Sequence, residues 1–156
     1  LERGVIDATE WVGPHDDMKL GLHTTARFYH YPGWHEPATT LEFTFNKKAY
    51  DGLSVDLQRI LDHAVTVVSV QGLSEYEAKN AIALERLKTE FRGKVEIVPL
   101  PPAVLASLKK MAQEVIAAES TKSPMAKKVH ASFSKFQTQL GGWRHISEGA
   151  YHQFVA

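Results

Sequence analysis

The stretch VIDATEWVGP occupies residues 5–14 and joins β-branched and aromatic residues to an abrupt Gly-Pro stop. Residues of these types favour strands, and a Gly-Pro pair ends them. We therefore expect a strand over residues 5–12, followed by a turn at Gly13 and Pro14. Beyond the turn, Asp16 and Asp17 are suited to cap a short helix that runs to about Thr24.

Two further strands are expected on the C-terminal side of this turn. Residues 26–31 form a short aromatic run that ends at a Pro-Gly pair. Between residues 39 and 46, Leu41, Phe43 and Phe45 alternate with polar residues. This period of two places the three apolar side chains on one face of a half-buried strand.

After Asn46 the hydrophobic period becomes that of a helix. Ser54 is a good N-cap, and apolar residues then recur at helical spacing from Leu57 to Val68. Gly72 and a capping box at residues 74–77 leave two alternatives open, one long kinked helix or two helices in series.

The last third of the chain is predicted to hold a short strand over residues 95–100 and then helices. Prolines at residues 101 and 102 suit the first turn of one helix, and Pro124 ends it. A second apolar stripe follows, and we expect it to be buried against another surface, in this chain or in a partner. Its members are Val129, Phe133, Phe136, Leu140 and Trp143. The fold class is therefore α/β, with a helix-rich second half.

Composition excludes several classes of protein. The 156-residue chain carries 18 Lys+Arg against 18 Asp+Glu, and 44% of its residues are hydrophobic, as in an ordinary globular domain. It has no cysteine, which rules out disulfide scaffolds, cysteine-ligated metal sites and thiol nucleophiles. No apolar run approaches the ~18 residues that a membrane-spanning helix requires.

Charge is unevenly distributed along the chain. Residues 1–42 hold seven acidic and three basic residues, whereas residues 92–156 hold four acidic and nine basic ones. The lysines of the basic part are dispersed along helical patterns, without an arginine cluster or a Gly-aromatic RNA-binding motif. A solvated helix face accounts for them, and we expect no nucleic-acid partner.

The residues best suited to chemistry lie before residue 47. If the first two expected strands lie side by side, Glu10 and Glu36 are at similarly directed ends. Two converging carboxylates repel each other unless a cation or a shared proton lies between them, and a hard cation such as Na⁺ or Ca²⁺ prefers such oxygen ligands. Equally, the two can be unrelated surface carboxylates. His30 and His35 lack the spacing of a transition-metal site.

Hydrolase signatures are missing from the sequence. It contains no Gly-x-Ser-x-Gly, no glycine-rich phosphate loop and no His-Glu-x-x-His. Trp11 and Trp34 are each compatible with a place in the core or in the wall of a ligand site. These residues alone indicate no reaction.

Two strings carry a family resemblance. Residues 4–14 (GVIDATEWVGP) resemble a signature of TRAP-transporter solute receptors of the DctP type, closest to members that bind 2-oxo acids and other small monocarboxylates. Residues 29–36 (YHYPGWHE) resemble the family's Tyr-Tyr-Pro-Gly-Trp-x-Glu stretch. The similarity continues to the end of the chain. Position 35 is His where relatives can carry an aromatic residue, and Pro37 stands where they can have Gly.

The resemblance implies an extracytoplasmic, periplasmic receptor without catalytic activity, which closes its two lobes on a ligand and passes it to the TRAP membrane permease subunits. It implies a periplasmic-binding-protein type II-like lobe with a short mixed sheet and long C-terminal helices. By position, the cation ligands would be the carboxylates of Glu10 and Glu36 and the carbonyl oxygen of Trp11. The cation would be Na⁺ or Ca²⁺, and Trp11 and Trp34 would contact the small carboxylate substrate.

Such receptors are about twice as long as this chain, which aligns with their second half. We expect ligand- and cation-site strands and loops over residues 1–50, a long helical segment over 51–92, and a short strand with C-terminal helices over 93–156. The first lobe, an arginine, a glutamine and the secretion signal would lie upstream of Leu1. A homodimer through the C-terminal helix is also implied.

Two alternatives from other functional classes stay open at this point. One is a cation-dependent enzyme acting on a small carboxylate with Glu36 or His35 as its base. The other is a helical oligomerisation module in which the α/β front end is only a scaffold.

Overall fold

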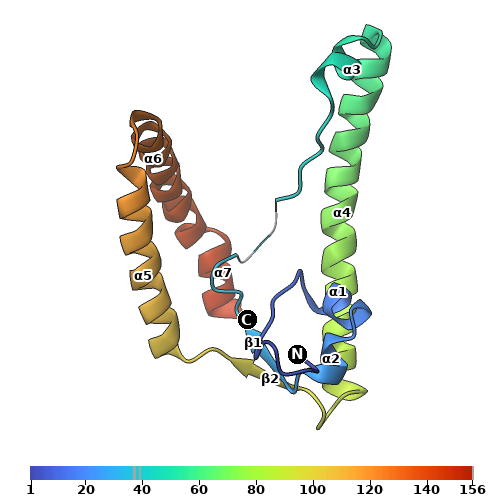
Figure 1. Ribbon diagram of the computed structural model, residues 1–156, viewed down its shortest axis with the longest axis vertical. Helices are drawn as coiled ribbons and strands as arrows, with labels where there is room; N and C mark the ends of the chain where they lie inside the picture. The colour runs from blue at the N-terminus through green and yellow to red at the C-terminus, as the bar shows by residue number, and fades with distance from the viewer. Residues whose placement is uncertain (37, 39, 156) are drawn as a thin grey trace. The chain divides into compact units, whose positions relative to one another are not determined.

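The chain is arranged in two compact units, residues 1–100 and residues 101–156. A computed structural model describes residues 1–36, 38 and 40–155. The first unit contains α1 (Pro14–Lys19), α2 (Leu22–Thr25), β1 (Phe28–Tyr31), α3 (Lys47–Asp51), α4 (Val55–Thr89) and β2 (Glu96–Pro99) (Figure 1). The second contains α5 (Pro102–Ser120), α6 (Pro124–Ile146) and α7 (Glu148–Val155). Among the described helices, none is both long and apolar enough to cross a membrane.

The two strands pair in parallel and join segments that are far apart in the sequence. Phe28 is opposite Glu96 and Tyr31 is opposite Pro99. The Arg27 guanidinium contacts the Glu96 carboxylate across the strands, with Nη2 and Oε1 2.6 Å apart. The α/β class with a helix-rich second half is confirmed. The mixed pairing that we expected is not seen in the described part of the chain, where both strands run the same way.

The strands expected over residues 5–12 and 39–46 are wrong. Residues 5–12 and 40–46 form bends and extended segments without a ladder, and Thr39 lies outside the described residues. Both segments have the right composition, but strand preference expresses packing against neighbouring strands. Within the described ranges neither segment has such a neighbour, and the side chain of Leu41 is 70% exposed.

The expected helix after Pro14 is present in two pieces. Leu20 and Gly21 interrupt it, and Gly21 has a left-handed φ of 75°, which glycine adopts without a Cβ clash. Asp16 and Asp17 are in the first turn of α1, and Gly13 takes the N-cap position that we expected an aspartate to fill. Their negative charges still favour that end of the helix dipole.

The long helix α4 resolves the alternative left open by the sequence. It runs without interruption for 35 residues from the Ser54 N-cap, through Gly72 and the expected capping box. Ser74 does not open a new helix. Because it lies within a continuous helix, its Oγ donates to the carbonyl oxygen of Val70, four residues earlier, at 3.0 Å. One glycine costs a helix only about 1 kcal/mol, so the flanking turns continue through it.

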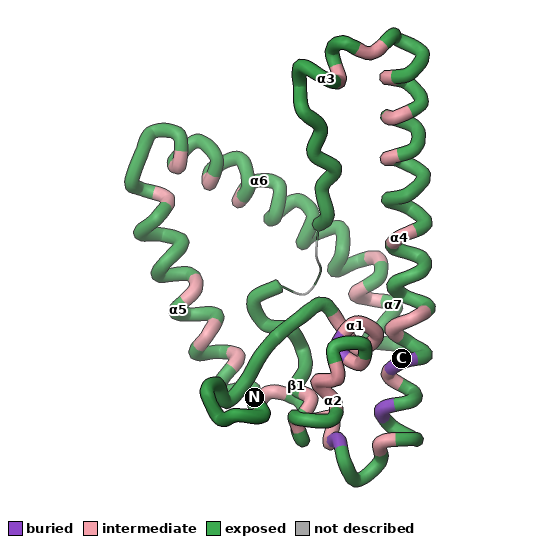
Figure 2. Tube along the Cα trace, turned by 45° about the vertical axis from the view of Figure 1, so that its right-hand side comes forward, coloured by how far each residue is buried: buried purple, intermediate pink, exposed green. Residues whose placement is uncertain are grey.

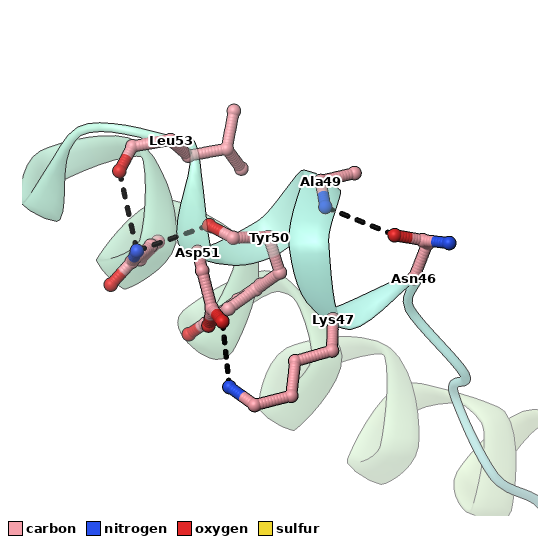
Figure 3. A network of polar contacts seen from close by, with 7 residues as sticks. Asn46, Lys47, Ala49, Tyr50, Asp51 and Leu53 are labelled. Atoms are coloured by element: carbon pink, nitrogen blue, oxygen red, sulfur yellow. Dashed lines mark hydrogen bonds and ion pairs between the residues drawn. The ribbon is translucent and has the colours of Figure 1, made fainter.

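A polar network attaches α3 to the start of α4 (Figure 3). Asn46 accepts a hydrogen bond from the backbone N–H of Ala49 at 3.0 Å and so caps α3. Gln58 Nε2 donates to the carbonyl oxygens of Tyr50 and Leu53, at 3.0 and 3.2 Å. The Tyr50 hydroxyl donates to Asp62 Oδ1 at 2.8 Å.

The core of the first unit lies at the C-terminal end of α4. Ala83, Leu87 and Val95 are the buried hydrophobic residues in the described ranges, and Asp17 of α1 is buried with them (Figure 2). Further toward its N-terminus, α4 leaves much of its expected apolar face exposed, including Leu57, Ile60 and Val68.

The second unit is built from helices alone. The turn between α5 and α6 ends at Ser123, whose Oγ accepts from the backbone N–H of Ala126 at 3.0 Å. Pro124, which the sequence predicted to end the preceding helix, instead begins α6, and α5 ends earlier, at Ser120. The five apolar residues of the predicted stripe, Val129 to Trp143, are all exposed. This face of α6 is therefore not buried within the described chain, and a partner surface is the alternative that fits.

We expect Leu87→Ala to lower the free energy of unfolding by about 2–4 kcal/mol, because Leu87 is 1% exposed and its loss leaves a cavity in a small core. Ile82→Ala, on the same helix at 63% exposure, should change it by less than about 1 kcal/mol. Urea unfolding followed by circular dichroism measures both. Equal losses of unfolding free energy in Leu87→Ala and Ile82→Ala would contradict a core centred on Leu87.

Candidate functional site

A broad depression of about 1450 Å³ opens on the first unit. Its lining comes from the N-terminal segment, α1, β1, the segment after β1 and the middle of α4. Glu10, Trp11 and Glu36 are among the lining residues, as are Asp17 and Tyr29. Three of the sequence-predicted site residues therefore share one concave surface.

Glu10 and Trp11 are held in place through α1, which begins directly after them. The backbone N–H of His15 donates to Asn80 Oδ1 of α4 at 3.0 Å. A Cβ at Gly13 would lie 3.1 Å from the same oxygen, so any larger residue would have to displace the Asn80 side chain by a few tenths of an ångström. Asn80 thus fixes the beginning of α1 on α4, and the Trp11 side chain remains 56% exposed over the depression.

The second predicted segment approaches Glu10 through a histidine. His35 Nε2 is 3.4 Å from Glu10 Oε2. Glu36 follows His35 directly and lines the depression. The sequence predicts that the two glutamates come together through the pairing of two strands. That pairing does not form, yet the contact between the two segments does.

Trp34 is placed differently from Trp11. Its ring packs edge-on against the His35 ring at a centroid distance of 5.5 Å, and the side chain is 47% exposed. It is not among the lining residues of the depression. His30 does line it, and its ring lies near that of Phe28.

Sequence reasoning missed a buried polar pair beside Glu10. Asp17 is only 8% exposed, and its Oδ2 accepts a hydrogen bond of 2.6 Å from the Tyr29 hydroxyl. Burial raises the pKa of Asp17, the bond from Tyr29 opposes that rise, and the charge of Glu10 adds to it. Burial and the neighbouring carboxylate also raise the pKa of Tyr29. The available signal is the adjacent pair Asp16 and Asp17, which the sequence alone presents as a helix cap.

The donor set matches only part of a cation site. Carboxylate and carbonyl oxygens are what Na⁺ or Ca²⁺ would take, and Glu10, Trp11 and Glu36 supply them. Ca²⁺ takes six to eight oxygens, however. Within residues 1–36, 38 and 40–155, no group of three or more His, Asp or Glu side chains is assembled for a metal. The oxygens of these three residues fit a hard cation chemically, but their number is below what Ca²⁺ takes.

Comparison with known proteins places the chain in a family. Residues 1–123 match the bacterial extracellular solute-binding proteins, family 7 (DctP). The chain belongs to this family. It is 35% identical, over all 156 residues, to a monocarboxylate 2-oxoacid-binding periplasmic protein of Nostoc sp., of which it covers 42%.

Solved DctP-type structures resemble the chain closely. A TRAP periplasmic solute-binding protein from Pseudoalteromonas atlantica, with bound sodium and pyruvate, is 36% identical with a TM-score of 0.92; the match covers 100% of this chain and 47% of that one. A second, from Colwellia psychrerythraea with bound calcium and pyruvate, is 34% identical with a TM-score of 0.91, covering 98% and 46%.

A third, from Bordetella bronchiseptica, is a mixed-occupancy dimer with calcium and picolinate in one active site and the other site apo. It is 31% identical with a TM-score of 0.86, and the match covers 99% of this chain and 45% of that one. The chain thus spans a little under half the length of these relatives and has the fold of a lobe of a TRAP solute-binding protein.

Asp17 should leave a pH signature on stability. Because its pKa is raised on folding, the folded protein holds this proton more tightly than the unfolded chain does. Its contribution to stability is complete below the ordinary carboxyl pKa and is lost as pH rises through the folded pKa. As pH rises through this range, we expect the free energy of unfolding of Asp17→Asn to increase relative to that of wild type. Urea unfolding at a series of pH values measures both.

Tyr29→Phe provides the matched variant, because it removes the hydrogen bond that lowers the pKa of Asp17. It should move the loss of stability to higher pH. A difference in unfolding free energy between wild type and Asp17→Asn that stays the same at every pH would contradict the raised pKa of Asp17.

Proposed function

We propose that the chain is the C-terminal half of a two-lobed, periplasmic TRAP solute receptor. The receptor captures a small carboxylate, such as a 2-oxo acid, a hydroxy acid or a dicarboxylate, together with Na⁺ or Ca²⁺. It then delivers this ligand to the membrane permease subunits. The observation that carries the proposal is the convergence of Glu10, Trp11 and Glu36 on one depression, in a family whose solved members hold pyruvate with sodium or calcium.

Electrostatics explains why a cation is needed. Glu10 and Glu36 both present carboxylates to the surface that would receive an anionic ligand. Like charges at close range disfavour the ionised form of both groups and repel a third anion. A bound cation reverses the sign of the local field, so the glutamates remain ionised and the ligand carboxylate is attracted.

The individual roles follow from position and exposure. Glu10 and Glu36 would bind the cation through their carboxylates, and Trp11 through its carbonyl oxygen. The half-exposed ring of Trp11 would form a wall of the ligand site. Trp34 lies outside the lining and is proposed as a contact at the rim. The remaining cation ligands and an arginine for the ligand carboxylate would come from the first half of the receptor.

Two observations support the assignment to half of a receptor. The chain covers between 42% and 47% of the relatives described above. Much of the apolar face of α4 is also exposed, and a contiguous apolar face of this kind marks a surface that another part covers. We propose that the first lobe covers it. The division into residues 1–50, 51–92 and 93–156 stays part of this proposal, although β2 belongs by its contacts to the first compact unit.

We propose a receptor without catalysis, since solute binding is the property of the family. The enzymatic alternative needs Glu36 or His35 as a free base. His35 is instead 3.4 Å from Glu10, where it joins the two site segments. The alternative of a purely helical module gains no support, because the front end of the chain forms the concave surface.

A second copy of the chain is the proposed partner for the exposed face of α6. Five apolar residues recur there on one face, from Val129 to Trp143, and Lys128, Val129 and Phe133 line a shallow hollow on it. The Bordetella relative is a dimer, which supports a homodimer in which the C-terminal helices of two copies cover each other's apolar face.

We expect the full-length receptor to bind pyruvate only when Na⁺ or Ca²⁺ is present, and this chain alone to bind it weakly. Glu10→Gln and Glu36→Gln should each weaken binding by at least the roughly 10- to 100-fold that outer-shell changes cost at metal sites. Isothermal titration calorimetry in buffers with and without each cation measures these affinities.

Glu42→Gln is the matched control, because Glu42 is exposed in the same part of the chain and does not line the depression. Tight, cation-independent binding by the isolated chain would contradict the proposal, as would equal effects of all three substitutions.

The dimer has its own test. We expect sedimentation velocity to show a sedimentation coefficient that rises with concentration for the wild-type chain. Phe133→Glu should shift the protein toward monomer, because it places a charge at the centre of the apolar face. Thr138→Glu, at an exposed polar position on the opposite side of the same helix, should leave the association unchanged. A wild-type monomer at every concentration would rule the dimer out.

A further inference from the structure

The two segments that carry the proposed cation ligands are loops, and something must hold them at a fixed separation. Glu10 and Trp11 precede α1, and Glu36 lies five residues beyond the end of β1. The strand that would have connected the first segment to β1 does not form. The positions of these ligands relative to one another therefore depend on side-chain contacts between α1 and β1.

The hydrogen bond from Tyr29 to Asp17 is such a contact. Tyr29 is in β1 and Asp17 is in α1, and the 2.6 Å bond between them joins the elements that position the two loops. Asp17 is buried and both residues line the depression. A charge-assisted bond in a buried setting is shorter and stronger than one at the surface, so it fixes geometry well.

Two further contacts make the arrangement rigid on either side of this bond. Asn80 of α4 accepts a hydrogen bond from the backbone N–H of His15 and so holds the beginning of α1 against α4. His35 reaches Glu10 at 3.4 Å from the other segment. The Asp17–Tyr29 bond is the member of this set that connects α1 directly to the sheet.

The second oxygen of Asp17 supports a role in the site. Oδ1 of Asp17 is buried and has no hydrogen-bond partner among the described residues. A buried carboxylate oxygen without a partner costs free energy. Asp16 Oδ2 and His15 Nε2 of the same helix are also buried without a partner among the described residues. Glu10 is near enough for its charge to act on Asp17.

We propose that Asp17 and Tyr29 are positioning residues for the cation–carboxylate site, whose hydrogen bond sets the separation of the Glu10–Trp11 loop from the Glu36 segment. The proposal rests on the proposed function, since it takes those three residues as the cation ligands. Neither Asp17 nor Tyr29 needs to touch the cation or the ligand.

The test uses the full-length receptor with pyruvate as the titrant, in buffers containing calcium or sodium. Tyr29→Phe should weaken pyruvate binding roughly three- to tenfold, the scale of one lost hydrogen bond. The number of sites per receptor should remain that of wild type, and more calcium should be needed to reach the same affinity. A merely structural role would instead reduce the number of competent sites without changing the affinity of those that remain.

Tyr50→Phe is the matched control. Tyr50 also donates its hydroxyl to an aspartate, Asp62 at 2.8 Å, but neither residue lines the depression. Figure 3 shows Tyr50 within α3. This variant should bind pyruvate as wild type does. At the site itself, Asp17→Asn keeps an acceptor oxygen for Tyr29 and should lose less affinity than Asp17→Ala.

The outcomes separate the two proposals. If Glu10→Gln and Glu36→Gln abolish binding while Tyr29→Phe and Asp17→Ala keep the wild-type affinity, the positioning role is overturned and the receptor function stands. If wild-type receptor does not bind pyruvate with either cation, the proposed function fails and this inference fails with it. Equal losses for Tyr29→Phe and Tyr50→Phe would also overturn the positioning role.

Discussion

The parallel pairing of β1 with β2 is the constraint on which the first unit depends. It joins residues 28–31 to residues 96–99, so everything between them must leave the sheet and return to it. The 35-residue helix α4 makes most of that path, and its C-terminal end brings Leu87 and Val95 into the small core. α1 packs on the same helix, which gives the Glu10–Trp11 loop a fixed base close to β1. The concave surface is a consequence of this closure.

The proposed site gathers carboxylates, whose negative charges repel one another. Among its described lining residues the depression has five acidic ones, Asp7, Glu10, Asp17, Glu36 and Glu77, against the two basic ones Arg27 and Lys88, so negative charge predominates there. The proposed cation, bridging protein and ligand, would compensate the negative charge of these carboxylates. The hydrogen bond from Tyr29 to Asp17 and the contact between His35 and Glu10 hold these acidic groups in place.

The sequence predicted the long helices α4, α5 and α6 better than the short helices α3 and α7, which it missed, and it predicted the outer strands poorly. α5, α6 and the start of α4 have local signals in Pro102, Pro124 and Ser54, and local signals determine helix ends. Residues 5–12 and 39–46 carry strand composition, but a strand requires a neighbour that composition cannot reveal. For the site, motif resemblance predicted Glu10, Trp11, Trp34 and Glu36, of which all but Trp34 line the depression. It could not find the Asp17–Tyr29 bond, which depends on how α1 and β1 pack.

The central claim is that one cation lies between the Glu10 and Glu36 segments and bridges to the ligand. The most direct measurement is a crystal structure of the full-length receptor grown with calcium and pyruvate, with the cation located by anomalous diffraction. We expect the calcium ion about 2.3–2.6 Å from carboxylate oxygens of Glu10 and Glu36 and from the carbonyl oxygen of Trp11. A calcium ion elsewhere, or pyruvate bound without any cation contact to these residues, would contradict the account.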